Sequence, residues 1–385
     1  MQPFTFNSVG RIVSGPGEAL RLAEHLGSLK VKRVLLVTDP GLLSIGLVGP
    51  VQNALAEAGG DVTLFAQVSE DPPEHVVEAA AQAGRDGEVE GVLALGGGSS
   101  MDVAKVAAAL IPGGQQLSEM YGVDQVTVTR LPLVLVPTTA GTGSEVTPVA
   151  VITTGETTKA GVSSAVLLPD IAVLDADLTL GLPPKITAMT GVDAMVHAIE
   201  AYTSKIKKNP ISDNLATSAL HLLATNIRTA VHNGRERAAR GAMLLGAMQA
   251  GQAFANAPVA AVHALAYPLG GHFHIPHGLS NSLVLPSVLR FNMPEAHGLY
   301  AEIADLVTGR TLEGSDEAKA LAMIEALETL IVDLELPATL NAAGVNEESL
   351  EQLAEDAMLQ QRLLVNNPRE VAYDDALGIY RAAYA

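Results

Sequence analysis

Mostly apolar runs alternate with helix-like stretches over the first 180 residues, and this alternation constrains the fold more than any other feature. Strands with almost no polar face are buried on both sides, as happens when helices cover both faces of a parallel sheet. The helix-like stretches include VGPVQNALAEAG and EHVVEAAAQAG. The predicted strands are Arg33–Thr38, Asp61–Val68, Gly91–Leu95 and Leu131–Val136. We therefore predict an α/β domain with a parallel sheet.

The pattern changes at the double proline Pro183-Pro184. Beyond it the strand-like runs disappear and helical periodicity dominates, as in RGAMLLGAMQAGQAFANA and EAKALAMIEALETLIVDL. A chain of 385 residues is long enough for two domains with separate cores. We predict an α/β domain over residues 1–182 and an all-α domain over residues 183–385.

The composition excludes several classes of partner. A net charge of −19 argues against a nucleic-acid surface, because a phosphate backbone requires a basic stripe. The chain contains no cysteine, so any bound metal is held by nitrogen and oxygen atoms. No apolar run is long enough to span a bilayer, and the N-terminus MQPFTFNSVGR lacks the layout of a secretory signal. We predict a cytoplasmic protein with no nucleic-acid or membrane partner.

Two glycine-containing segments follow predicted strands. The first, residues 96–102 (GGGSSMD), opens a helix, where glycines allow close approach of a ligand and the helix N-terminus offers N–H groups to a phosphate. The alternative is a tight turn in which serine and aspartate cap the helix. The second, residues 137–145 (PTTAGTGSE), places hydroxyls and glycines at the carboxyl end of a strand, where open α/β sheets bind ligands.

Asp39 ends the predicted strand RVLLVTD. A carboxylate at this point accepts hydrogen bonds from both ribose hydroxyls of an adenosine and repels a 2′-phosphate, which favours NAD over NADP. In the usual Rossmann fingerprint the acidic residue follows the glycine loop by about 20 residues. Here it precedes the loop, so we predict a Rossmann-like variant with a different strand order.

Four residues of the C-terminal half form a candidate metal site. Asp193 and His197 are four residues apart and so share one helix face, while His263 and His277 lie in AVHALAYPLGGHFHIPHG. Taken singly, Asp193 is better explained as a helix cap and His197 as a core histidine. Together the four supply one carboxylate and three imidazoles, a set that suits Fe(II) or Zn(II) without choosing between them. Such a site leaves the metal a net positive charge and makes it a Lewis acid.

The motifs GGGSSMDVAK, PTTAGTGSEVT, GVDAMVHAIEAY and AVHALAYPLGGHFHIPHG, in this order, resemble the group III iron-dependent alcohol dehydrogenases. The resemblance runs from about Phe4 to Arg381. It implies a Rossmann-like dinucleotide-binding domain followed by an all-α metal-binding domain, the dehydroquinate synthase-like fold. It further implies a homodimeric, metal-dependent, NAD(H)-linked alcohol dehydrogenase or aldehyde reductase that acts on small or primary alcohols.

The resemblance also implies functional residues. The implied metal ligands are Asp193, His197, His263 and His277. For Lys159, a cofactor contact and an ordinary solvated lysine are equally good interpretations. The implied cofactor contacts are Asp39, Gly97, Gly98, Ser99, Asp102, Thr138, Thr139, Thr142, Lys159 and Leu178.

Tyr267 occupies a position where many family members carry a histidine that relays the substrate proton. A phenol, with a pKa near 10 in the absence of perturbation, is a weaker relay at neutral pH. We therefore expect Tyr267 to form a substrate wall with Phe254 and Val149. His272, expected with His274 in a glycine-bounded loop, is a candidate substitute relay, and solvent is another.

Four other functions are alternatives for such a chain. A dehydroquinate-synthase-like lyase needs several lysines and arginines around a phosphorylated substrate, and few lie near these motifs. A metal-free maleylacetate-reductase-like enzyme is disfavoured by four intact ligands. A glycerol-dehydrogenase-like oxidoreductase and a catalytically silent nucleotide-binding protein remain alternatives. Bound metal and NADH turnover distinguish the silent protein from an enzyme.

Overall fold

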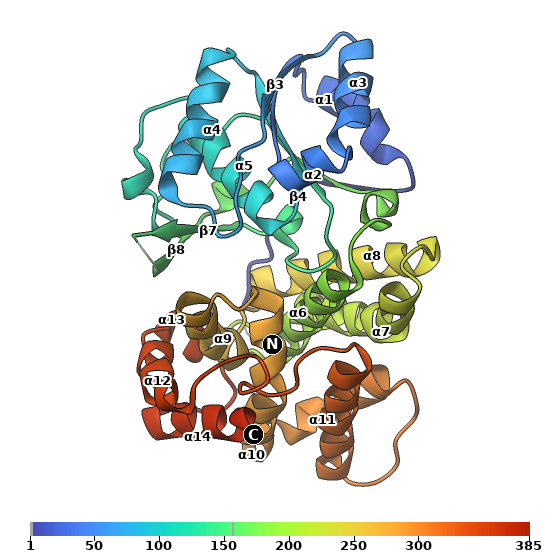
Figure 1. Cartoon of the computed structure of the whole chain (residues 1–385), viewed down its shortest axis with the longest axis vertical. Coiled ribbons are helices and arrows are strands. Elements are labelled where there is room, and N and C mark those ends of the chain that lie inside the picture. Colours follow the sequence, from blue (N-terminus) through green and yellow to red (C-terminus); the bar gives the residue numbers. More distant parts are fainter. Residues whose placement is uncertain (1–2, 156–157) are drawn as a thin grey trace. The chain divides into compact units, whose positions relative to one another are not determined.

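The computed structural model of the chain describes residues 3–155 and 158–385, which divide into two compact units (Figure 1). The α/β unit comprises Asn7–Thr139 and Gly143–Leu180. The helical unit comprises residues 3–6, Ala140–Thr142 and Gly181–Ala385. The division after Leu180 lies two residues before the predicted boundary at 182. The short segment Ala140–Thr142 groups with the helices although its neighbours in the chain do not.

Within the described part of the α/β unit, six strands form one parallel sheet in the order β1-β9-β6-β4-β2-β3. The four predicted strands are β2, β3, β4 and β6, while β1 and β9 were not predicted because each has only four residues. Counted from β2, the order β3-β2-β4-β6-β9 is the doubly wound 2-1-3-4-5 arrangement, with β1 added at the edge. The bounds are β1 Arg11–Ser14, β2 Arg33–Val37, β3 Asp61–Phe65, β4 Gly91–Gly96, β6 Leu133–Pro137 and β9 Ile171–Leu174.

Helices cover both faces of this sheet (Figure 1). Leu35 and Val37 of β2 pack in one apolar cluster with α4 and α5, whereas Val34 and Leu36 pack in the other with α1 and α3. The alternation follows from the strand repeat of two, and it explains why both faces of inner strands such as β2, β4 and β6 are apolar. The helices are α1 Leu22–Ser28, α2 Pro40–Ser44, α3 Val48–Glu57, α4 Glu74–Asp86 and α5 Gly98–Leu110.

A smaller sheet completes the α/β unit. It consists of β5 (Gly122–Val123), β8 (Thr158–Ser163) and β7 (Val149–Thr154), in that order, and β7 and β8 pair as an antiparallel hairpin. The sequence analysis did not predict it. The unit also contains the 3₁₀ turns η1 Glu18–Arg21, η2 Leu117–Glu119, η3 Ser144–Val146, η4 Ala165–Leu167 and η5 Ala176–Thr179.

The helical unit begins with α6 (Pro184–Thr203), whose first turn contains a proline, a residue that is well tolerated there. Asn209 caps α7, its side chain accepting a hydrogen bond from the Ser212 N–H. The unit also contains the turn η6 Glu347–Ser349. Its further helices are α7 Pro210–His232, α8 Arg237–Asn256, α9 Ala261–Phe273, α10 His277–Thr308, α11 Asp316–Asp333, α12 Leu350–Met358, α13 Gln361–Leu364 and α14 Tyr373–Tyr384.

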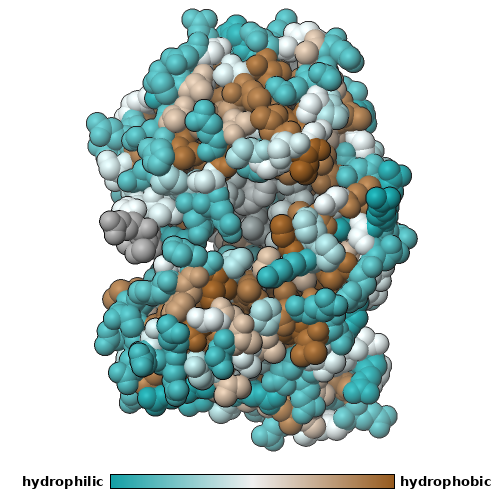
Figure 2. All heavy atoms as spheres, in the orientation of Figure 1, coloured by the Kyte–Doolittle hydropathy of each residue, from teal (hydrophilic) through white to brown (hydrophobic). Residues whose placement is uncertain are grey.

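On the face shown in Figure 2, hydrophilic side chains cover the outer parts of each unit. This agrees with a chain that carries 42 acidic and 23 basic residues. None of the helices among the described residues combines the length and the apolarity that crossing a bilayer requires. The cytoplasmic location stays a prediction.

Candidate metal centre and cofactor loops

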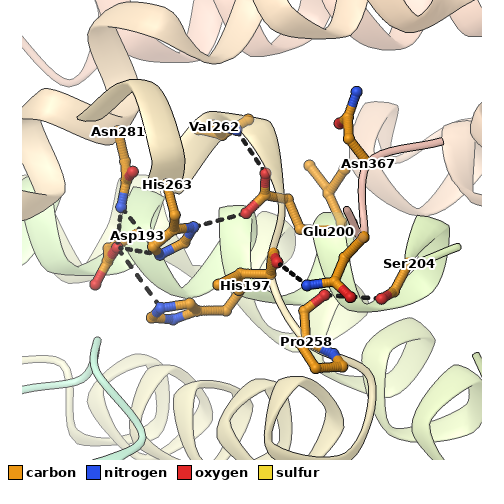
Figure 3. A network of polar contacts seen from close by, with 12 residues as sticks. Asp193, His197, Glu200, Ser204, Pro258, Val262, His263, Asn281 and Asn367 are labelled. Atoms are coloured by element: carbon orange, nitrogen blue, oxygen red, sulfur yellow. Dashed lines mark hydrogen bonds and ion pairs between the residues drawn. The ribbon is translucent and has the colours of Figure 1, made fainter. Parts of the chain in front are cut away.

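Three helices bring the four predicted metal ligands together. Asp193 and His197 come from α6, His263 from α9 and His277 from the first turn of α10, and one potential ligand atom of each lies within 4.8 Å of the others. The Oδ1 atom of Asp193 is 3.9, 3.8 and 3.6 Å from the Nε2 atoms of His197, His263 and His277. Figure 3 shows Asp193, His197 and His263 pointing toward one another.

A glycine allows α10 to approach α6 this closely. Gly278 follows His277, and a Cβ atom there would lie only 2.3 Å from the carbonyl oxygen of Met189. Any other residue would push the start of α10 away from α6, and His277 would move away from Asp193 with it. The glycine after the last ligand is therefore part of the geometry of the site.

Glu200 holds the ring of His263. The Nδ1 atom of His263 is 2.6 Å from Oε2 of Glu200, and Oε1 of the same carboxylate accepts a hydrogen bond from the Val262 N–H at 2.7 Å (Figure 3). With Nδ1–H donating to the carboxylate, Nε2 keeps its lone pair on the side of Asp193. The sequence analysis missed Glu200. Its position three residues after His197 and seven after Asp193, on the same helix face, was the available signal.

Asn281 is a second residue that the sequence analysis missed. It lies one turn after His277, and its Nδ2 atom donates to Oδ1 of Asp193 at 2.6 Å. The same Nδ2 atom is 3.3 Å from the Nε2 atoms of His263 and His277. The lone pairs of the carboxylate and the imidazoles thus converge on one electropositive group, as they would on a metal ion. A buried carboxylate among imidazoles fits a cation of the Fe(II) or Zn(II) type.

The pKa values agree with this interpretation. Burial lowers the pKa of His197 to about 3, so its imidazole is neutral at neutral pH, which is the metal-binding form. Burial works to raise the pKa of Asp193. The surrounding imidazoles and the Asn281 amide lower it more, and the carboxyl pKa lies below its usual value. Both side chains are therefore in the protonation state that a metal requires.

The two aromatic residues of the predicted substrate wall in the helical unit lie against predicted metal ligands. The ring of Phe254 stacks on His197 with a centroid distance of 4.3 Å and an interplanar angle of 25°. The ring of Tyr267 is 5.9 Å from that of His277, at 47°. Both are partly exposed. Val149 lies in β7 of the α/β unit, and the roles of all three stay predictions.

The loop expected around His272 is wrong. Helix α9 continues through Gly270 and Gly271 and ends at Phe273, because buried residues such as Leu269 anchor it. The C-cap residue His274 has a φ of 52°. The His272 ring is exposed, and its Nε2 atom forms a hydrogen bond of 2.5 Å with Oδ2 of Asp356. An imidazole on a helix is less free to swing than one on a glycine loop, and a relay role for His272 stays a prediction.

The first glycine segment joins β4 to α5, and Asp39 follows the neighbouring strand β2. In a 2-1-3-4-5 sheet these strands flank the switch point where ligands bind. Gly97 is the N-cap of α5 and has no side chain that could cap the helix, so the first N–H groups of α5 suit a phosphate. The alternative in which a serine and an aspartate cap the helix is wrong, because the N-cap is Gly97 and the Asp102 carboxylate accepts hydrogen bonds from Ser144 and Val151. Asp39 itself caps α2, with Oδ1 accepting from the Leu42 N–H at 2.9 Å.

The other predicted cofactor contacts are spread over several segments. Thr138 and Thr139 follow β6, which pairs in parallel with β4, so the ends of both strands meet at one edge of the sheet. Thr142 belongs to the helical unit and Leu178 to η5. Lys159, in β8, forms an ion pair with Asp71 at 2.6 Å. The cofactor roles of these residues stay predictions.

Comparison with known families agrees with this geometry. The model of the iron-containing alcohol dehydrogenases matches residues 10–176, and that of the C-terminal domain of the Fe-containing alcohol dehydrogenase family matches residues 187–384. The chain belongs to the iron-containing alcohol dehydrogenase family. The predicted family, the predicted fold class and the predicted activity, that of a metal-dependent alcohol dehydrogenase, are thereby confirmed.

Individual relatives cover almost the whole of this iron-containing alcohol dehydrogenase. Long-chain-alcohol dehydrogenase 1 of Geobacillus thermodenitrificans is 40% identical over 387 residues, which is 98% of each chain. A crystal structure of a 1,3-propanediol oxidoreductase is 35% identical, with a TM-score of 0.96 over 100% of both chains. A sulfoacetaldehyde reductase from Bifidobacterium kashiwanohense, solved in complex with NAD+, is 30% identical, with a TM-score of 0.89 over 100% of both chains.

Proposed function

We propose that this enzyme oxidises small or primary alcohols to aldehydes with NAD+, and catalyses the reverse reduction with NADH. We further propose that it uses Fe(II) held by Asp193, His197, His263 and His277. The observation that carries the proposal is the convergence of one buried carboxylate and three imidazoles within 4.8 Å of one another. The uncapped N-terminus of α5 and the NAD+ complex of a related reductase support the choice of cofactor. We propose a homodimer on the family resemblance alone.

The metal and the cofactor would supply the chemistry of the reaction, and the chain would supply the positions of the reacting groups. When bound, the metal supplies the Lewis acidity that lowers the pKa of the substrate hydroxyl, and NAD+ supplies the hydride acceptor. The chain holds the ligand atoms in place, with Glu200 orienting the ring of His263. Phe254 and Tyr267 offer aromatic surface beside the ligands, where the carbon chain of an alcohol would pack.

Anaerobic metal analysis coupled to a panel of alcohols and aldehydes tests this proposal. Enzyme stripped with a chelator should be inactive, and Fe(II) should restore turnover with NAD+ or NADH. Loading with Zn(II) in parallel determines which metal supports the reaction. Turnover that persists at the wild-type rate in fully stripped enzyme would contradict the assignment of the metal.

Cofactor choice should depend on the charge of Asp39. We expect the wild type to prefer NAD(H) over NADP(H), and Asp39→Gly to narrow or reverse the preference. Repulsion of a 2′-phosphate is worth about 1–3 kcal/mol at an intermediate dielectric constant. Asp39→Asn is the sharper variant, because asparagine keeps the cap on α2 and removes only the charge. The measurement is kcat/KM for both cofactors, and a wild type that uses NADP(H) equally well would refute the prediction.

Tyr267→Phe should change KM and substrate range more than the maximal rate, because we assign Tyr267 to the substrate wall. Loss of a general acid–base group costs about 10²–10⁴-fold in rate, and a loss of this size would make Tyr267 the relay instead. We expect His272→Ala to shift the pH–rate profile more than Tyr267→Phe does. Asp356→Asn provides a second test, since it changes the partner of the His272 ring and leaves the ring in place.

A further inference from the structure

Helix α5 carries a lysine whose side chain is completely buried. Lys105 has 0% exposure, and its Nζ atom donates to Oγ of Ser144 at 2.7 Å, to Oγ1 of Thr147 at 3.1 Å and to the carbonyl of Val149 at 2.7 Å. An ammonium group has three N–H donors. All of them are therefore used, and all bind the short segment Ser144–Val149.

Asp102, one turn earlier on α5, binds the same segment. Its Oδ1 atom accepts from the Ser144 hydroxyl at 2.6 Å, and its Oδ2 atom accepts from the Val151 N–H at 2.9 Å. The Oδ1 atom is also 3.7 Å from Nζ of Lys105. The Ser144 hydroxyl thus accepts a hydrogen bond from the lysine and donates one to the carboxylate. One face of α5 is tied to residues 144–151 by both charged groups.

The burial of these charges is energetically costly. Burial lowers the pKa of Lys105 to about 8 and raises that of the nearby, equally buried Glu145 to about 7. A buried ion pair is weak evidence for stability, because apolar residues of similar size often serve as well. What charged groups add is directional hydrogen bonding, which determines the position of the segment that they bind.

The segment bound by Lys105 and the helix α5 are each directly connected to one of the two predicted cofactor segments. The N-terminus of α5 carries the first predicted cofactor segment, with Gly97, Gly98 and Ser99. Ser144 ends the loop that starts at Thr138 and Thr139, the second predicted segment. The two segments follow the paired strands β4 and β6. Lys105 therefore joins the helix that begins at one segment to the exit of the other.

We propose that Lys105 is a positioning residue that fixes the two cofactor segments relative to each other and so sets the affinity for the dinucleotide. The inference rests on the proposed NAD(H) function. It assigns no contact between Lys105 and the cofactor. Its substitution should therefore weaken NADH binding and leave the chemical step at saturating cofactor largely intact.

The experiment measures the dissociation constant of NADH by fluorescence titration of the metal-loaded enzyme. Lys105→Met should raise the dissociation constant of NADH about tenfold or more. The nearly isosteric Thr147→Val should raise it about two- to tenfold, as the loss of hydrogen bonds predicts. The matched control is Thr203→Val, whose buried hydroxyl donates to the Ile199 carbonyl of its own helix. The dissociation constant of this control should stay within about twofold of the wild-type value. The maximal rate at saturating NADH and the iron content should change little in all three variants.

Hydrogen exchange of the cofactor-free enzyme is the second measurement. The Val151 amide and the peptide covering residues 138–151 should exchange faster in Lys105→Met and Thr147→Val than in Thr203→Val. An unchanged dissociation constant in folded Lys105→Met would overturn the proposal. Where that variant does not fold, an unchanged constant in Thr147→Val would do so. A wild type that binds no NADH would contradict the proposed function, and unchanged exchange over residues 138–151 would then separately overturn the role of Lys105.

Discussion

We expect His263→Ala to abolish alcohol oxidation and to reduce bound metal to background while the helical unit stays folded. His263 supplies one of three imidazoles around Oδ1 of Asp193, and its ring also stacks on His197 with a centroid distance of 4.7 Å. Removing it leaves the buried carboxylate with a weaker ligand set. Because a bound metal contributes several kcal/mol of charge stabilisation, the rate should fall by more than about 10²-fold. Metal analysis and circular dichroism of the purified variant provide the measurement.

His25→Ala is the matched control. His25 is also a buried histidine with a ring nitrogen bonded to a glutamate, here Oε2 of Glu18 at 3.1 Å, but it lies in the α/β unit. This variant should keep full metal content. Full metal occupancy in His263→Ala would remove His263 from the ligand set, and loss of metal in both variants would point to general destabilisation.

Glu200→Ala should give the second largest effect, a loss of metal affinity of about 10–100-fold, which is typical when a carboxylate that supports a metal-binding histidine is removed. Its two oxygens accept from Nδ1–H of His263 and from the Val262 N–H. Without them the imidazole is free to rotate or to carry its proton on Nε2, where it cannot bind metal. Glu200→Gln keeps one acceptor oxygen for two donors and should lie between alanine and the wild type. Competition with a chelator measures the dissociation constant, and the absorption spectrum of the Co(II)-substituted enzyme reports the ligand geometry.

The control for Glu200 is Glu302→Gln. Glu302 also accepts a hydrogen bond, from the Tyr202 hydroxyl at 2.5 Å, but not from a metal ligand. Its substitution should leave metal affinity and the Co(II) spectrum unchanged. A folded Glu200→Ala variant that binds metal within about twofold of wild type would show that His263 does not depend on this carboxylate.

Much of the fold follows from local pattern. Apolar runs such as β4 cannot be placed at a surface, so burial between two layers of helices could be predicted. Strands β1 and β9 have four residues each and carry too little pattern to be recognised. The glycine pair Gly270-Gly271 predicts a loop, but the buried face of α9 outweighs the low helix propensity of glycine.

The sequence by itself indicated the candidate ligand set: a carboxylate and an imidazole four residues apart share one face of a helix, and the family resemblance implied His263 and His277. Only the tertiary structure revealed the residues that are hydrogen-bonded to those candidate ligands. Glu200 and His263 are 63 residues apart, and Asn281 and Asp193 are 88 apart. The partners of Lys105 are likewise separated from it by 39–44 residues. Contacts between residues so far apart depend on how helices and loops pack. Hydrophobic periodicity indicates which face of an element is buried, but not which distant residue that face contacts.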